Sequence, residues 1–210
     1  MSIVRCWLER LFKCFYEYTD FQNVFNPEMI NLLFDNDKPV PLQFHIQKPS
    51  LDVNKFTYKL ENVLRFALNH LSISDSLSVD YFEENTSEQQ IDILFNILTN
   101  EGNKLPQFCL KSLRNFEMSR LYDLIFEYVT TSKDLSKVVP VIMLEYMSAT
   151  NFEVNKKAEN VEIKEFNGVK CTKFQIVNKF DPTVKFSFCN AESKIGSAFK
   201  FKMTIMKKRM

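Results

Sequence analysis

The chain has 210 residues, a formal net charge of +1 and 45% hydrophobic residues. The balanced charge argues against a nucleic-acid partner, because neutralising phosphates takes a concentrated basic excess. Ordinary hydrophobic content excludes a disordered chain, and no stretch approaches the ~20 consecutive apolar residues of a membrane-spanning helix. The 21 phenylalanines against three glycines indicate a dense core with little flexible linker.

The five cysteines have no regular spacing and include no CxxC pair, so the sequence predicts no zinc site. Reduced thiols fit a reducing compartment. The amino-terminal apolar run contains Arg5, Glu9 and Arg10, which is not the pattern of a signal peptide. We therefore expect an intracellular protein, cytoplasmic or nuclear.

The amino-terminal part is predicted to be helical. Apolar residues recur with helical spacing over residues 2–16, at Val4, Trp7, Leu8, Leu11 and Phe15. A second, shorter helix is predicted to begin at Asn26 and Pro27, a good capping residue followed by a good first helical residue. Together the two helices would form a cap.

Four short apolar segments follow, centred on Phe44, Val79, Leu110 and Leu144, with steps of roughly 31 to 35 residues. Each of the first three is followed by an amphipathic helix. A strand and one helix cannot bury their own apolar faces, whereas successive units stacked in one parallel sheet can. The rhythm therefore predicts a parallel β–α array.

Beyond residue 148 the sequence changes to strict alternation of apolar and polar residues, and Asn167-Gly168 is a strong hairpin signal. The predicted fold class is α/β: a short leucine-rich-repeat-like parallel β–α array with an N-terminal helical cap and a C-terminal antiparallel β meander. Residues 1–148 would hold the cap and the repeat region. Residues 149–210 would hold the meander, packed on the sheet or extending it. A three-layer sheet is the alternative architecture.

No group of residues stands out as a catalytic, cofactor-binding or metal site. The two histidines, His45 and His70, occupy a strand and a helix end where structural roles explain them. The acidic pairs Glu83-Glu84 and Asp35/Asp37 lie in polar connectors, and three glycines cannot form a phosphate-binding loop. We expect no enzyme and no cofactor. The alternatives are a hydrolase or transferase using the acidic loop at Glu83-Glu84, or a degenerate paralogue without activity.

Five segments resemble the region downstream of the F-box in an expanded family of F-box-type proteins from plant-parasitic nematodes. They are residues 25–36, 68–77, 93–106, 158–163 and 174–182. They occur in the same order and span most of the chain. None is a catalytic motif, and residues 1–35 do not read as an F-box.

The resemblance implies a non-catalytic protein-interaction module, similar to the substrate-recognition region of a ubiquitin-ligase adaptor. In the family the F-box docks on Skp1. Because residues 1–35 lack the F-box pattern, Skp1 binding is doubtful here. The expected partner is a protein or substrate of unknown identity, and neither a nucleic acid nor a membrane is expected. The concave face of a repeat array would provide the contact surface. The candidate partner-binding residues on that face are Gln43, His45, Ser78, Asp80 and Lys111.

Overall fold

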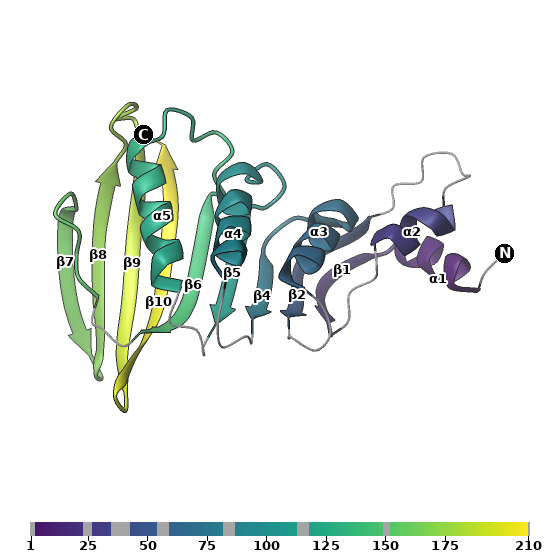
Figure 1. Ribbon diagram of the computed structural model, residues 1–210, viewed down its shortest axis with the longest axis horizontal. Helices are drawn as coiled ribbons and strands as arrows, with labels where there is room; N and C mark the ends of the chain where they lie inside the picture. Colours follow the sequence, from purple (N-terminus) through teal and green to yellow (C-terminus); the bar gives the residue numbers. More distant parts are fainter. Residues whose placement is uncertain are drawn as a thin grey trace.

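A computed structural model describes residues 3–22, 27–34, 43–53, 59–81, 87–112, 118–148 and 152–209. Within these residues the chain forms one mixed sheet of ten strands, with five helices (Figure 1). The helices are α1 (Ile3–Leu11), α2 (Pro27–Phe34), α3 (Leu60–His70), α4 (Glu88–Asn100) and α5 (Met118–Thr131). The strands are β1 (Phe15–Phe21), β2 (Phe44–Val53), β3 (Leu71–Ile73), β4 (Leu77–Tyr81), β5 (Gln107–Ser112), β6 (Val141–Ser148), β7 (Glu159–Phe166), β8 (Val169–Val177), β9 (Val184–Ile195) and β10 (Ala198–Arg209).

The strand order is β1-β2-β4-β5-β6-β10-β9-β8-β7, and β3 pairs with the first part of β2. The strands from β1 to β6 are parallel, whereas β10, β9, β8 and β7 are antiparallel. The chain therefore passes from β6 to the far edge of the sheet and returns strand by strand to β6. The meander extends the sheet, and a division of the chain between residues 148 and 149 stays a prediction.

The predicted fold class is wrong. The chain does not form a leucine-rich-repeat-like array under a helical cap, because its parallel strands belong to one mixed sheet that includes the meander. The amino-terminal segment is also not a cap of two helices. Its first helix ends at Leu11, and residues 15–21 form β1, which pairs in parallel with β2. The aromatic and β-branched composition of that segment suits a strand better than a helix.

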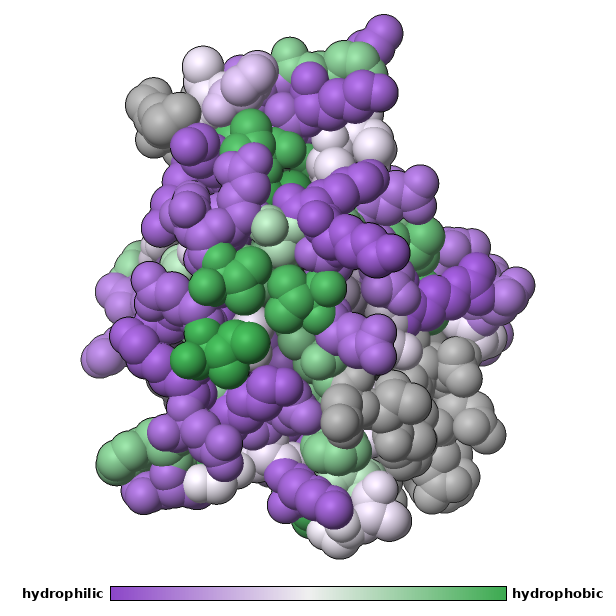
Figure 2. All heavy atoms as spheres, turned by 90° about the vertical axis from the view of Figure 1, so that its left-hand side faces the viewer, coloured by the Kyte–Doolittle hydropathy of each residue, from purple (hydrophilic) through white to green (hydrophobic). Residues whose placement is uncertain are grey.

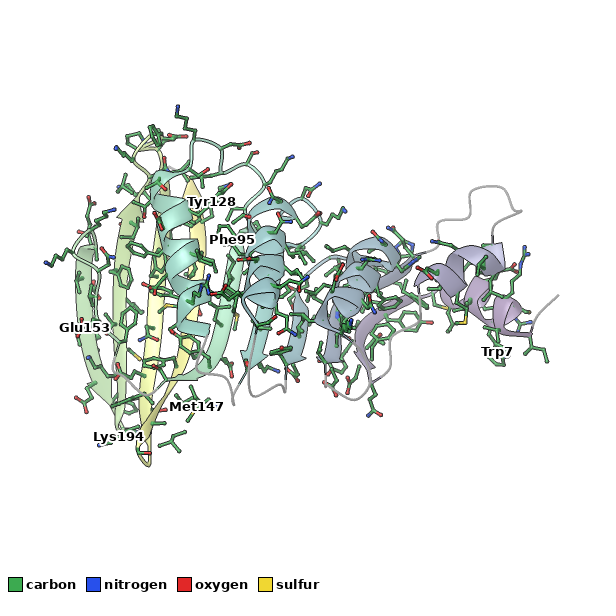
Figure 3. All side chains as sticks on the ribbon, in the orientation of Figure 1. Trp7, Phe95, Tyr128, Met147, Glu153 and Lys194 are labelled. Atoms are coloured by element: carbon green, nitrogen blue, oxygen red, sulfur yellow. The ribbon has the colours of Figure 1, made fainter. Side chains whose placement is uncertain are left out.

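The three-layer alternative is wrong as well, because α3, α4 and α5 all lie on one face of the sheet (Figure 1). The burial of β6 alternates strictly along the strand, so one face is covered and the other is half-exposed. Across the covered side, helices α4 and α5 contact each other through Phe95 and Tyr128, whose ring centroids are 5.6 Å apart (Figure 3).

The start of α4 shows how local sequence positions these helices. Ser87 caps the helix by accepting a hydrogen bond from the backbone N–H of Gln90, and the Gln90 side chain accepts one from the backbone N–H of Ser87 at 2.8 Å. This reciprocal pair is a capping box, which satisfies two backbone donors at the helix start. The helix then directs Leu94 and Leu98 onto the sheet, where both are fully buried.

Nine of the 21 phenylalanines, together with Tyr122, form two aromatic clusters, one at each end of the sheet. The amino-terminal aromatic cluster consists of Phe12, Phe21, Phe34, Phe44 and Phe66. The carboxy-terminal aromatic cluster consists of Tyr122, Phe126, Phe152, Phe174 and Phe188. Both belong to a single continuous hydrophobic core.

Candidate functional site

The face of the sheet opposite α3, α4 and α5 carries a row of charged side chains near the carboxyl ends of the parallel strands. The residues occupy matched register positions on β2, β4, β5, β6 and β10, and they are Asp52, Asp80, Lys111, Glu145 and Lys202. We call this set the charged row. Residues at the same register position of neighbouring strands point to the same face, so their side chains meet.

Two ion pairs hold most of the charged row together. Lys111 Nζ lies 3.2 Å from Asp80 Oδ1, and Lys202 Nζ lies 3.2 Å from Glu145 Oε1. The lysine side chains are half-exposed, whereas that of Glu145 is 15% exposed. Half-exposed ion pairs contribute little to stability, so their main effect is to set the local charge pattern.

Asp52 lies at the end of the row, where negative charge accumulates. Partial burial raises the pKa of the Asp52 carboxyl, the nearby Asp20 and Asp80 raise it further, and Lys111 opposes the shift. Partial burial acts to lower the pKa of Lys111. The hydrogen bond to Asp80 and the negative charges of Asp80 and Glu145 act in the opposite direction, and the pKa of Lys111 is raised overall. The row thus places a carboxyl group with a raised pKa, that of Asp52, beside the ion pair of Asp80 and Lys111.

The structure brings together three of the five residues predicted to bind a partner. Ser78 and Asp80 lie on β4, and Lys111 is the register partner of Asp80 on β5. The other two lie near the amino end of β2. Gln43 donates a hydrogen bond to the carbonyl of Asn69, and His45 is paired with residues of β1 and β3.

The acidic pairs considered in the sequence lie outside the described residues, Glu83 and Glu84 in the connection from β4 to α4 and Asp35 and Asp37 in that from α2 to β2. Within the described part of the chain, no group of three or more histidine, cysteine, aspartate or glutamate side chains could hold a metal ion. Across the same residues, none of the helices has the length and apolar character needed to cross a membrane.

A cavity lies beside the edge strand β1, next to the amino-terminal aromatic cluster. Its volume is about 330 Å³, within the range of roughly 300–1,000 Å³ that small-molecule sites occupy. It is open on one side and its walls are almost entirely apolar. The lining residues are Leu11, Tyr16, Tyr18, Thr19, Phe21, Phe44 and Ile46.

Three of the lining residues carry a hydroxyl, namely Tyr16, Tyr18 and Thr19. The hydroxyl of Thr19 is buried and has no hydrogen-bond partner among the described residues. Tyr16 contributes a phenol whose pKa is raised, first by burial and then by the neighbouring Cys14. An apolar cavity with a few polar groups is the usual form of a small-molecule site.

Sequence analysis did not find this cavity. Its walls come from the end of α1, from β1 and from β2, so they form only when β1 pairs with β2. The aromatic residues of residues 15–21 give the strand pattern, but the sequence does not say that a space remains between them. The unpaired Thr19 hydroxyl likewise has no signal in the sequence.

Comparisons with known proteins leave the function open. Residues 1–82 match the model of a domain of unknown function, DUF8381. This region includes α1, β1 and β2, and therefore every residue that lines the cavity. A search of curated proteins finds no significant match.

Among solved structures, the crystal structure of an S-adenosylmethionine-dependent methyltransferase from Clostridium acetobutylicum ATCC 824 matches at 10% sequence identity with a TM-score of 0.22. The match covers 99% of this chain and 71% of the other. At this level of similarity it assigns no activity to the chain.

Two predictions about function are corrected. The prediction of a non-catalytic interaction module, or ubiquitin-ligase adaptor, is wrong as it was stated. Its contact surface was the concave face of a leucine-rich-repeat-like array, and the structure has a mixed sheet instead. The prediction that the chain is not an enzyme is corrected as well. It was argued from the lack of a catalytic group in the sequence, whereas the sheet brings Asp52, Asp80 and Lys111 together on one face. The resemblance to the nematode F-box-type family is tested by none of these findings and stays a prediction.

Proposed function

We propose that the protein binds a small, largely apolar molecule in the cavity beside β1. The observation that carries this proposal is the buried hydroxyl of Thr19, without a partner among the described residues, in a largely apolar wall. A buried hydroxyl without a partner costs roughly 1–3 kcal/mol, and a ligand with one polar group would remove that cost. The chemical class is therefore an aromatic or aliphatic molecule with a single hydroxyl or carbonyl group.

The shape of the cavity supports the same class. Tyr16, Phe21 and Phe44 provide ring surfaces, which favour a flat or aromatic ligand. The described lining residues include no charged side chain, so an ionised ligand would be desolvated there without a partner among them. The five cysteines are free thiols, and an intracellular location is part of the proposal because reducing compartments maintain that state.

Naphthol is a suitable probe, because it combines an aromatic body with one hydroxyl. We expect it to bind the wild-type protein, as measured by calorimetry and by saturation-transfer NMR. Thr19→Val should weaken binding about tenfold, the effect of one lost hydrogen bond. Leu11→Trp should abolish binding by filling the cavity.

The matched control is Tyr122→Phe, which removes a buried hydroxyl that also has no partner but lies in the other aromatic cluster. Its affinity for naphthol should equal that of the wild type. The proposal would be contradicted if neither Thr19→Val nor Leu11→Trp changed the affinity for naphthol, or if the folded wild-type protein did not bind naphthol.

One observation favours a second function at the charged row, which is acid–base catalysis. The pKa of Asp52 is raised, and its register neighbour Asp80 forms an ion pair with Lys111. A carboxyl group with a raised pKa can act as a general acid or base. The test is a panel of chromogenic esters, glycosides and phosphates. Turnover that Asp52→Asn reduces by about a hundredfold or more would support this function, and no turnover of any substrate would remove it.

A further inference from the structure

Strand β7 forms one edge of the sheet and is exposed along its whole length. All eight of its residues are exposed, including Val161 at 44%, Ile163 at 58% and Phe166 at 76%. Its inner side pairs with β8, and among the described residues no strand pairs with its outer side. A long edge strand with exposed apolar side chains offers a row of free backbone groups to another strand.

The turn that joins β7 to β8 determines which backbone groups are free. Asn167 and Gly168 both have positive φ, 50° and 73°, as a two-residue type I′ turn requires. Phe166 and Val169 flank this turn and are register partners, so they form a hydrogen-bonded pair. Because hydrogen-bonded and non-bonded positions alternate along an antiparallel strand, Glu165 and Ile163 direct their N–H and C=O groups outward.

The charges of β7 favour pairing with an identical strand. Glu162 and Lys164 flank Ile163 on either side, and both point to the face opposite to that of Ile163. In an antiparallel pair of two β7 strands centred on Ile163, each Glu162 lies opposite the partner's Lys164. The two isoleucines meet at the two-fold axis and exchange both backbone hydrogen bonds.

We infer that two copies of this chain associate through β7, antiparallel and centred on Ile163, to form one continuous sheet across the dimer. The neighbouring symmetric registers are less favourable. A centre on Glu162 places two carboxylates opposite each other, and a centre on Lys164 does the same with two ammonium groups, and like charges directly opposite each other are destabilising. The interface is closed by two-fold symmetry, so it ends at a dimer.

Features around the centre agree with this partner. Figure 2, which looks onto the β7 side of the molecule, shows hydrophobic side chains in the middle of this face with hydrophilic ones around them. In the inferred register Val161 lies opposite Glu165 of the other copy, which adds two further contacts. The irregularity between Glu159 and Glu162 limits the regular paired stretch at the other end of the strand.

The test is a charge exchange on the full chain, followed by sedimentation over a range from about 1 µM to about 1 mM. The wild type should show a monomer–dimer equilibrium. E162K and K164E should each raise the dissociation constant about tenfold or more, because each places like charges opposite each other at two positions. The double variant E162K/K164E restores opposite charges and should return the dissociation constant to near the wild-type value.

A blocking variant supports the interpretation. I163P removes an N–H that points outward, so β7 can keep its pairing with β8 while the dimer is lost. Circular dichroism and amide NMR spectra establish that each variant is folded. Three results would overturn the inference. The folded wild type could stay monomeric at every concentration, the double variant could dissociate as readily as either single variant, or the chain could form open-ended assemblies in place of a dimer.

Discussion

The two aromatic clusters are built from the same residue type but pack differently. In the carboxy-terminal cluster Phe174 and Phe188 are stacked with an interplanar angle of 6° and centroids 5.0 Å apart, and both are fully buried. Steep pairs occur in both clusters, Tyr122 with Phe188 at 89° and Phe12 with Phe44 at 64°. The described rings of the amino-terminal cluster include no stacked pair, and a cavity remains beside them. The difference follows from position: the first cluster lies under α5 within the sheet, whereas the second borders the edge strand β1.

The comparison indicates that the closed cluster stabilises the fold and the open one leaves room for a ligand. An edge strand has a neighbour on one side only, so side chains that point past it have fewer atoms to pack against. The same apolar chemistry then produces a core at one end of the sheet and a pocket at the other. The predictions below test this division, beginning with the largest expected effect.

Phe188→Ala should reduce the free energy of unfolding by about 3–5 kcal/mol. Phe188 is 0% exposed and contacts Tyr122, Phe126 and Phe174, so its removal loses buried apolar surface and also leaves a closed cavity. Urea unfolding followed by circular dichroism measures the change. The control Phe15→Ala removes the same side chain from a 64% exposed position and should cost at most about 0.5 kcal/mol.

Phe21→Ala should cost less, about 1.5–3 kcal/mol, although Phe21 is also buried and contacts Phe44 and Phe66. Its removal enlarges a cavity that is already open to solvent. The cost is therefore mainly the lost free energy of burying the phenyl ring, without the added cost of a closed cavity. The same urea experiment compares it with Phe188→Ala. Equal costs for the two variants would show that the amino-terminal cluster is closed, and would break the comparison.

How much of this could be predicted from the sequence depends on the distance between the residues that make each feature. The strand β4 follows directly from the alternation of Leu77, Val79 and Tyr81, all of which are buried. The sequence offers two equivalent capping patterns at the start of α4, Thr86 with Gln89 and Ser87 with Gln90, and the helix uses the second. Local chemistry identified the motif, and packing selected its position.

Features that require distant pairing could not be predicted. Whether β7 or β10 joins β6 depends on the whole sheet: β10 buries Phe201, Met203 and Ile205 between β6 and β9, whereas no residue of β7 is buried. Of the candidate site residues, Ser78 and Asp80 share a face because they are two residues apart on β4, whereas the position of Lys111 beside Asp80 depends on the pairing of β4 with β5. The cavity beside β1 was missed because three separate elements form it.

Thr19, in the wall of the cavity beside the amino-terminal cluster, and Tyr122, in the carboxy-terminal cluster, each have a buried hydroxyl without a partner among the described residues, which provides a matched pair of substitutions. Thr19→Val and Tyr122→Phe should each stabilise the free protein by about 1 kcal/mol, since each removes an unsatisfied buried group. Naphthol should separate them. A ligand that binds the folded state raises the unfolding temperature, and this rise should be smaller for Thr19→Val but unchanged for Tyr122→Phe. Thermal unfolding with and without naphthol measures both effects, and an equal rise for the two variants would contradict the role given to Thr19.

The smallest effect concerns alkaline pH, and it again distinguishes the two clusters. Burial raises the pKa of Tyr122 above the ordinary value of 10.0, and the nearby Tyr146 and Asp123 add to the shift. Below pH 10 both the folded and the unfolded chain keep this proton. Above pH 10 the unfolded chain releases it while the folded chain does not, so stability falls as the pH rises.

Tyr122→Phe should therefore make the decline of stability above pH 10 shallower. The phenol of Tyr16, at the open cavity, also has a raised pKa, but it borders space that solvent can enter. We expect Tyr16 to ionise while the protein is still folded, and Tyr122 to ionise only as the protein unfolds. Tyrosinate absorbance recorded together with circular dichroism distinguishes the two: Tyr16→Phe should remove absorbance gained before unfolding, and Tyr122→Phe absorbance gained with it. If both variants lost absorbance in the same step, the two ends of the sheet would be equally closed to solvent, and the cavity beside β1 would not be accessible to a ligand.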